Sequence, residues 1–343
     1  MIKKFKNLFW KFYSLRDKNY KENFYGSFNL WRIIIINLLK PGRLINRLRF
    51  GQLFIYRNIE KLEKKFNKKL QSKDLDIQSD KREKLTVGLK ELCDFGGCVV
   101  KEYFNEKEIS DLIIKNKELI NSLKISNELS QSAKIIPLSN ELNRIWLDDG
   151  ILLLLNTFFG RLAYTRNYPH IIYTNVPKDS SEDKYNQINW ADKWHVDHSV
   201  LFNVHIVLED IEINETRMQI LKGSHKFLNY GSNFSNNLVE KSNLKKIDCF
   251  GKRGTVYFHT GNAVHRIKPE QGSERLVLHF EFSPGSNILL DAKGIHESLM
   301  SGFDITTVNE QKQKVISPIF PKKLFKGYDF QNNHFRPTKY RGI

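Results

Sequence analysis

The stretch Trp194-His195-Val196-Asp197-His198 decides how the fold of this chain is interpreted. Two residues separated by one in a β-strand project from the same face, so His195 and Asp197 can point at one ion. A third ligand must come from elsewhere, and His265 closes a second motif, Gly261-Asn262-Ala263-Val264-His265. Two histidines and one carboxylate form the set that holds a non-haem ferrous ion by one face and leaves its other positions open. These residues therefore predict an iron site built on β-strands.

Arg275 follows His265 by ten residues. Its planar guanidinium carries a fixed fork of donors, which suits a bidentate grip on a carboxylate. A pair spaced like His195 and Asp197 occurs readily by chance in a chain with ten histidines, and a solvated turn is the alternative interpretation. The signal therefore becomes specific only through the motifs around it.

Several motifs occur in an order that resembles the phytanoyl-CoA dioxygenase family, which belongs to the larger group of Fe(II)/2-oxoglutarate-dependent oxygenases. They are Leu92–Val100, Phe104–Ile109, Trp194–Asp197, Leu208–Asp210, Gly223–Lys226, His265 and Arg275. The likeness covers roughly residues 88 to 290, and the order of the motifs is more specific than any one of them. Two departures bear on cosubstrate binding. Leu276 and Val277 follow the arginine where related oxygenases often carry a polar residue, and Lys222 replaces the usual proline before Gly-Ser-His.

The resemblance implies a mainly β protein with flanking helices (α+β), whose core is a double-stranded β-helix of the jelly-roll, cupin-like kind. It implies that His195, Asp197 and His265 are the catalytic metal ligands and that Arg275 binds the distal carboxylate of 2-oxoglutarate. The expected cofactors are Fe(II), 2-oxoglutarate as cosubstrate, and O2. The expected reaction is hydroxylation of an unactivated C–H bond in a small or lipid-linked organic substrate, with decarboxylation of 2-oxoglutarate to succinate. Related halogenases lack the carboxylate, so Asp197 favours hydroxylation, and desaturation stays open.

The positive charge of the chain is concentrated at its N-terminal end. The formal net charge is +17, and residues 1–70 hold 18 Lys and Arg against 4 Asp and Glu, which leaves 37 against 34 for all later residues. An apolar stripe at helical spacing runs through Phe5, Leu8, Phe9, Phe12 and Tyr13, with the lysines largely off it. This amphipathic helix either packs on the catalytic domain or lies on an anionic membrane surface, and both interpretations stay open.

Composition and pattern divide the chain into three parts. Residues 1–83 are predicted to be a basic helical N-terminal extension that ends in a linker at Lys73–Arg82. Residues 84–290 are predicted to be the oxygenase domain, and residues 291–343 a C-terminal extension. The N-terminal extension is predicted to include an exposed helix that buries one narrow seam, formed by Ile55, Ile59, Leu62 and Phe66.

Local signals inside the predicted domain mark helices first and strands later. A helix is expected to end at Gly96, and Asn105 with Glu108 is expected to form a capping box at the start of the next. Ile151–Leu155 fits either a buried helix or a strand. Short segments rich in β-branched and aromatic residues then predict strands: His170–Val176, Ser199–Leu208, Arg217–Leu221, Gly254–Phe258 and Arg275–Phe282.

The segment Arg275–Phe282 has the clearest alternation. If Arg275 points into the barrel, then Val277, His279 and Glu281 do too, and the residues between them form an apolar outer face that helices such as 109–119 can cover. His279 and Glu281 are therefore candidate pocket residues, with a buried hydrogen-bonded pair as the alternative. Trp194 is a third candidate, at the pocket mouth, with core packing as its alternative.

Other histidines compete for the metal. His198, His205 and His259 lie near the proposed ligands in sequence or on neighbouring predicted strands, so a zinc-like cluster is the alternative ligand set. The order of the oxygenase motifs favours His195 and its two partners instead. His225, in the Gly-Ser-His turn, is expected to fix a loop through a hydrogen bond.

Two other classes of function stay open. A β-helix scaffold could bind a ligand without turnover, although the intact ligand set argues against a non-catalytic binding protein. The basic N-terminal region also allows a nucleic-acid-directed oxygenase, which is disfavoured because the sequence carries no recognised nucleic-acid module. Three cysteines indicate a reducing compartment, and the apolar runs stay far below the roughly 20 residues that span a bilayer. The expected location is cytoplasmic, with peripheral attachment to the inner face of the membrane through residues 1–70 left open.

Overall fold

The computed structural model describes most of the chain between Ile59 and Ser283 and two short strands beyond it. The described residues are 59–70, 77–125, 130–134, 140–159, 163–165, 169–178, 193–197, 201–226, 233–283, 328–329 and 334–335. The amphipathic helix predicted near the N-terminus and the histidine at position 198 lie outside these ranges.

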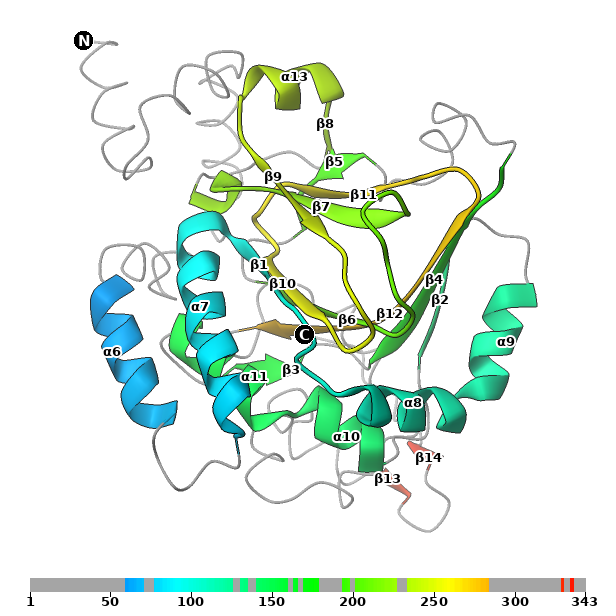
Figure 1. The fold of residues 1–343 in the computed structure, drawn as a ribbon, viewed down its shortest axis with the longest axis horizontal. Helices are drawn as coiled ribbons and strands as arrows, with labels where there is room; N and C mark the ends of the chain where they lie inside the picture. Colours follow the sequence, from blue (N-terminus) through cyan, green and yellow to red (C-terminus); the bar gives the residue numbers. More distant parts are fainter. Residues whose placement is uncertain are drawn as a thin grey trace.

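Two antiparallel β-sheets form the body of the structure (Figure 1). The seven-stranded sheet has the order β1-β10-β6-β12-β4-β2, with β3 also paired to β12, and the five-stranded sheet has the order β8-β5-β11-β7-β9. Their strands are β1 (Gly97–Val100), β2 (Ser130–Lys134), β3 (Tyr164–Thr165), β4 (His170–Val176), β5 (Trp194–His195), β6 (Phe202–Val207), β7 (Arg217–Leu221), β8 (Asn233–Phe234), β9 (Lys246–Cys249), β10 (Val256–Thr260), β11 (His265–Lys268) and β12 (Ser273–Ser283). A separate hairpin joins β13 (Tyr328–Asp329) and β14 (His334–Phe335). Antiparallel strands in two sheets form a jelly roll, so the predicted double-stranded β-helix core is confirmed.

Helices lie along one side of the large sheet, and in Figure 1 they line its outer face. They are α6 (Ile59–Leu70), α7 (Ser79–Phe95), α8 (Glu106–Lys115), α9 (Lys117–Ile125), α10 (Asn140–Trp146) and α11 (Asp149–Phe159), while α13 (Asn236–Lys241) sits by the small sheet. Phe66 and Leu70 of α6 are buried in the same apolar cluster as residues of α7 and α11. Of the predicted seam, Phe66 is therefore confirmed as buried, and it packs against the helices of the predicted domain; Ile55 lies outside the described residues.

The β12 strand divides the core in two, as its alternation predicts. Leu276, Leu278, Phe280 and Phe282 belong to the large cluster that the helices cover, whereas Val277 belongs to the smaller cluster between the sheets. The segment 109–119 contributes to this cover through buried and partly buried residues of α8 and α9. A side chain on the Val277 face of β12 therefore points into the barrel.

Local chemistry explains how the first helices begin and end. Asn105 caps α8 in the predicted capping box, where its side chain accepts from the backbone N–H of Glu108 and its own N–H donates to the Glu108 carboxylate, each at 2.9 Å. Gly96 ends α7 in the left-handed conformation at φ 80°, and a Cβ there would lie 2.4 Å from the ring of His225. His225 in turn hydrogen-bonds through Nε2 to the Cys93 carbonyl at 3.2 Å, so its predicted role in fixing a loop is confirmed.

Three expectations about secondary structure need correction or completion. The linker predicted at Lys73–Arg82 is wrong from residue 79 on, because α7 begins at Ser79. The segment 109–119 is not one helix, since α8 ends and α9 begins on either side of Asn116. The ambiguous run Ile151–Leu155 is helical and lies within α11. Burial of nearly every residue of α11 explains why its sequence shows no amphipathic period.

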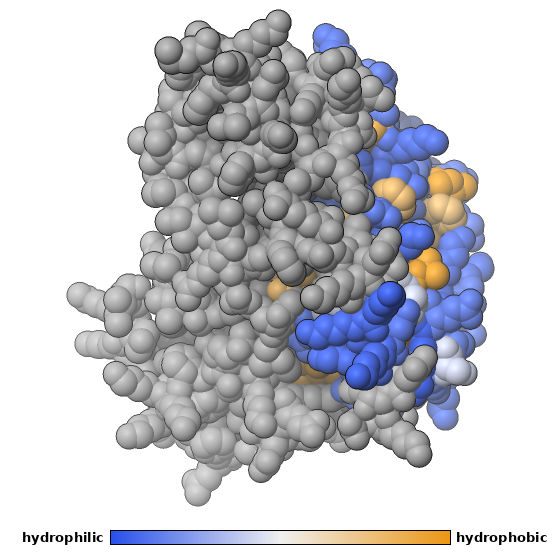
Figure 2. Space-filling view, turned by 90° about the vertical axis from the view of Figure 1, so that its left-hand side faces the viewer, coloured by the Kyte–Doolittle hydropathy of each residue, from blue (hydrophilic) through white to orange (hydrophobic). Residues whose placement is uncertain are grey.

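The described surface is largely polar. Figure 2 shows one side of the molecule, on which the described residues are mostly hydrophilic with small, separate apolar areas. The exposed large apolar residues come from different parts of the chain and are Val87, Ile114, Ile125 and Ile213. Single apolar residues of this kind are normal on a globular surface. Within the described ranges, each helix is too short or too polar to traverse a bilayer.

Candidate functional site

Strand pairing brings the three predicted ligands together. His195 at the end of β5 pairs directly with His265 at the start of β11, and their ring centroids lie 4.2 Å apart. Asp197 follows β5 outside the strand, so the predicted strand is shorter than the motif. Its Oδ1 lies 3.8 Å from His195 Nε2 and its Oδ2 lies 3.5 Å from His265 Nε2. One ligand atom from each residue lies within 4.8 Å of the other two.

Backbone carbonyls orient both imidazole rings. His195 Nδ1 lies 2.6 Å from the Lys193 carbonyl oxygen, and His265 Nδ1 lies 2.9 Å from the Ala263 carbonyl oxygen. A carbonyl oxygen only accepts hydrogen bonds, so each Nδ1 carries the proton and each Nε2 presents its lone pair towards Asp197. This arrangement, in which the second nitrogen is held by a backbone oxygen, is how proteins orient metal-binding histidines.

Burial keeps these rings uncharged. It lowers the pKa of His195 to about 4, with repulsion from His265 acting in the same direction, and it lowers the pKa of His265 to about 4. A metal-binding histidine must be neutral, and both rings meet that requirement at neutral pH. Together with one carboxylate, the donor set therefore fits a divalent transition metal held by one face.

A second polar centre surrounds Arg275. Its side chain is buried, and its Nη2 donates to the hydroxyl of Tyr257 at 2.6 Å. Thr174 is the register partner of Arg275 on β4, and it is buried as well. Among the described residues, neither Arg275 Nε nor Thr174 Oγ1 has a hydrogen-bond partner. A buried guanidinium N–H without an acceptor costs roughly 1–3 kcal/mol, so the chemistry of this corner fits a carboxylate ligand.

A row of ring side chains crosses the large sheet. Tyr257, His205, His279 and His170 are successive register partners on β10, β6, β12 and β4. His205 stacks on Tyr257 with ring centroids 4.7 Å apart and on His279 at 4.5 Å. Burial lowers the pKa of His205 well below its usual range, with repulsion from His279 adding to the effect, and burial lowers that of His279 to about 3. The inner face is therefore polar yet uncharged along this row.

His259 connects this row of rings to the candidate ligands. The ring of His259 lies 4.1 Å from that of His265, and its Nε2 lies 3.4 Å from His205 Nε2. His205 stacks on Tyr257, which accepts from Arg275, so contacts run without a break from His265 to the arginine. The only metal-type cluster within the described residues is His195, Asp197 and His265, so His205 and His259 line this path without joining a zinc-like set there.

The three candidate pocket residues do not all lie on the same side of the structure. His279 points inward, and its Nε2 lies 3.0 Å from the Asn203 side-chain oxygen. Glu281 is half-buried and is the register partner of Asn203. Trp194 is not brought together with them, because its ring lies under the Arg266 guanidinium at 4.6 Å, on the outer side of the small sheet. Asn203, Tyr257 and Thr174 were not predicted, since only the strand register shows which residues they face.

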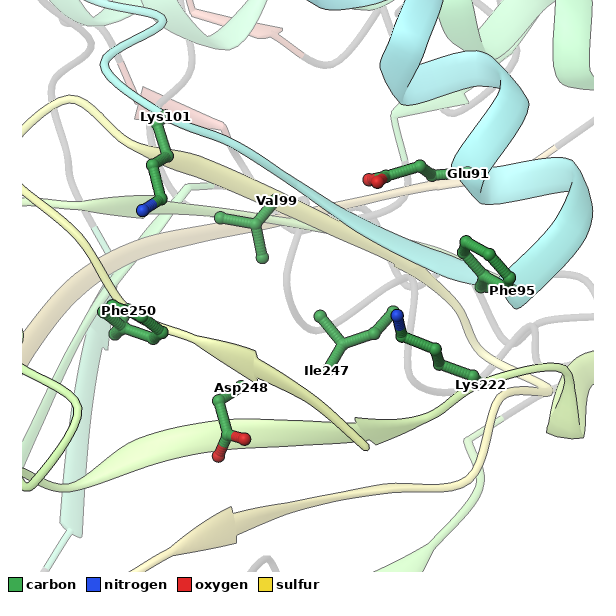
Figure 3. Close-up of a pocket in the computed structure, with 8 residues that line it drawn as sticks. All are labelled: Glu91, Phe95, Val99, Lys101, Lys222, Ile247, Asp248 and Phe250. Atoms are coloured by element: carbon green, nitrogen blue, oxygen red, sulfur yellow. The ribbon is translucent and has the colours of Figure 1, made fainter. Parts of the chain in front are cut away.

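A cavity elsewhere does not belong to this site (Figure 3). It has a volume of about 160 Å³ and is lined by residues of α7, β1 and β9 and their flanks: Glu91, Phe95, Val99, Lys101, Lys222, Ile247, Asp248 and Phe250. At one end the Lys222 ammonium lies 4.7 Å from the Phe95 ring, and at the other Lys101 lies 5.2 Å from the Phe250 ring. None of the three converging ligands lines it.

Comparisons with known proteins give structural similarity only. No protein-family model and no curated protein sequence matches the chain. Among solved structures, it is similar to SnoN, a non-haem α-ketoglutarate-dependent epimerase from nogalamycin biosynthesis, at 13% identity and a TM-score of 0.45 over 59% of this chain and 81% of that one. It is also similar to EctD from S. alaskensis, crystallised with 2-oxoglutarate and 5-hydroxyectoine, at 15% identity and a TM-score of 0.45 over 63% and 79%. The carbocyclase SnoK follows at 14% identity and a TM-score of 0.43, over 62% of this chain and 85% of that one. None of these similarities extends to the function of this chain.

Proposed function

We propose that this chain is an Fe(II)- and 2-oxoglutarate-dependent dioxygenase that hydroxylates an unactivated C–H bond. The observation that carries the proposal is the convergence of His195, Asp197 and His265 within 4.8 Å, with both histidines oriented by backbone carbonyls. Two histidines and one carboxylate suit a ferrous ion that keeps positions open for other ligands. The motif order that resembles the phytanoyl-CoA dioxygenase family supports the same assignment.

Each part of the site has a role in this proposal. His195, Asp197 and His265 would hold Fe(II), and Arg275 would bind the distal carboxylate of 2-oxoglutarate. Tyr257 supplies a hydroxyl group that contacts the guanidinium, Thr174 is the register partner of Arg275 on β4, and a carboxylate would accept from Arg275 Nε. When bound, iron and 2-oxoglutarate supply the means to oxidise a C–H bond with O2, with decarboxylation of 2-oxoglutarate to succinate.

The chain itself contributes position and exclusion of water. The stacked rings of Tyr257, His205 and His279 fill part of the barrel interior and would help to exclude water. Because His205 and His279 are neutral, they add no positive charge that would compete with Arg275 for the cosubstrate. His279 and Glu281 both lie next to Asn203, since Asn203 accepts a hydrogen bond from His279 and is the register partner of Glu281. Asn203 in turn donates to Asp197. We assign them to the pocket wall on this ground.

The substrate proposed is a small or lipid-linked organic molecule. The concentration of positive charge in residues 1–70 supports contact with an anionic membrane surface, because lysines and apolar residues at helical spacing suit a lipid interface. The oxygenase domain is assigned to residues 84–290, between the basic extension and the C-terminal extension at 291–343. This division stays a prediction.

Turnover tests the proposal. Protein supplied with Fe(II), 2-oxoglutarate and O2 is expected to form succinate slowly without substrate, and His265→Ala is expected to form none. Cells with and without the protein are then compared for small molecules and lipids that differ by the mass of one oxygen atom. A wild-type protein that forms no succinate above the His265→Ala background, with or without extracts of those cells, would contradict the proposal.

A further inference from the structure

Asn203 occupies a buried position between two polar groups that matter to the site. It lies on β6 and is 2% exposed. Its Nδ2 donates to Asp197 Oδ2 at 2.8 Å, and its Oδ1 accepts from His279 Nε2 at 3.0 Å. Both ends of the amide are therefore committed to defined partners.

Hydrogen-bond chemistry fixes which way this amide points. The Asp197 carboxylate can only accept, so it must face the NH2 group, and the carbonyl end of Asn203 must then face His279. An amide oxygen only accepts, so His279 donates from Nε2, and burial keeps the ring neutral by lowering its pKa to about 3. Strand register sets the geometry, because His279 on β12 pairs with His205, two residues along β6 from Asn203 and on the same face.

Asp197 is the one member of the ligand set that no strand holds. His195 and His265 are register partners in the small sheet, and their rings are fixed by backbone carbonyls. Asp197 lies beyond the end of β5. Asn203 belongs to the opposite, larger sheet, so its hydrogen bond ties the loop that carries Asp197 to a second rigid element.

We infer that Asn203, oriented by His279, is a positioning residue that holds Asp197 as a one-oxygen metal ligand. The inference rests on the proposed function. An N–H donated to Oδ2 occupies that oxygen in part and favours coordination through Oδ1, whereas an untethered carboxylate can swing to bind through both oxygens. Holding Asp197 to one oxygen keeps the open positions that the cosubstrate and O2 require.

Cobalt binding tests the inference without turnover. Asn203→Leu removes both hydrogen bonds at nearly constant volume, and Gln219→Met is the matched control. Gln219 is 4% exposed and its amide also bridges two groups, Asp248 at 2.7 Å and Arg266 at 3.1 Å, but on the outer face of the small sheet. We expect Asn203→Leu to raise the Kd for Co(II) about 10- to 100-fold and to change its visible absorption, which reports coordination number, while Gln219→Met does neither.

A second pair of variants covers the case in which Asn203→Leu does not fold. His279→Leu removes the donor that orients the amide, and His279→Gln restores an N–H near the position of Nε2. Weaker Co(II) binding in His279→Leu, with recovery in His279→Gln, supports the inference. Equal binding in both supports no role for the amide's orientation and overturns it.

The results distinguish failure of the positioning role from failure of the proposed function. Wild-type binding of Co(II) that is unchanged in Asn203→Leu overturns the positioning role and leaves the proposed function standing. Equal weakening in Asn203→Leu and Gln219→Met also overturns it, because loss of any buried amide would then suffice. A wild-type protein that binds no Co(II) overturns the proposed function and this inference together.

Discussion

Replacing Arg275 by alanine is the perturbation whose size follows most directly from the structure. Arg275 is 2% exposed, its Nη2 donates to the Tyr257 hydroxyl, and its Nε has no acceptor among the described residues. A carboxylate bound there would accept charge-assisted hydrogen bonds, which contribute roughly 1.5–3 kcal/mol. Arg275→Ala should therefore raise the Kd for 2-oxoglutarate about 10- to 150-fold, since each 1.4 kcal/mol corresponds to a factor of ten.

The assay is anaerobic titration of 2-oxoglutarate into protein loaded with Fe(II), with iron binding measured separately. Iron affinity should stay nearly intact, because the contacts that connect Arg275 with His265 run through Tyr257, His205 and His259. Arg275→Lys should recover part of the affinity, since an ammonium keeps the charge but loses the fork. Arg217→Lys, on the outer face of the small sheet, is the control. An unchanged Kd for 2-oxoglutarate in Arg275→Ala would refute the assignment of this arginine.

Three further predictions concern the fold and the N-terminal region. Leu278→Ala on the helix-covered face of β12 should lower the free energy of unfolding by about 2–5 kcal/mol in chemical denaturation, and a loss under 1 kcal/mol would contradict its place in the core. Burial alone would raise the pKa of Glu270, but hydrogen bonds from Lys268 and Arg217 lower it below its usual value, so ionised Glu270 contributes stability that is lost as the pH falls through that lowered pKa. Glu270→Gln should therefore flatten the acid limb of the stability profile, and an unaltered limb would argue against the ion pairs. Full-length protein should sediment with anionic vesicles at low salt and less at high salt, and deletion of residues 1–70 should abolish this; full-length protein that stays in the supernatant at low salt excludes membrane contact.

The sequence predicted the strands whose two faces differ in polarity. In β12 the inner and outer residues alternate strictly, because one face meets helices and the other meets the barrel interior, and the periodicity carries that information. The capping box at Asn105 and the helix end at Gly96 were predictable for a similar reason, since each depends on a few neighbouring residues. The helical state of α11 was not, because a fully buried segment shows no polar face to set the period.

In the candidate site, too, short sequence motifs were predictive, whereas contacts that depend on strand register were not. The HxD motif and a distant histidine predicted the candidate ligand set, but the direct pairing of His195 with His265 depends on register between β5 and β11. Asn203 reaches Asp197 from the other sheet, and no spacing in the sequence records that contact. Trp194 was predicted at the pocket mouth, but it neighbours His195 in β5, and neighbouring residues of a strand point to opposite faces. Its side chain therefore lies on the face away from the candidate ligands.

The anaerobic spectrum of the protein with Fe(II) and 2-oxoglutarate tests the central claim most directly. Chelation of iron by 2-oxoglutarate in a site formed by His195, Asp197 and His265 should produce a weak visible charge-transfer band, because a site with three protein ligands leaves positions for both chelating oxygens. His195→Ala and His265→Ala should each abolish the band, while Gln219→Met should retain it. A wild-type protein that binds zinc tightly and develops no band with Fe(II) and 2-oxoglutarate would contradict the account.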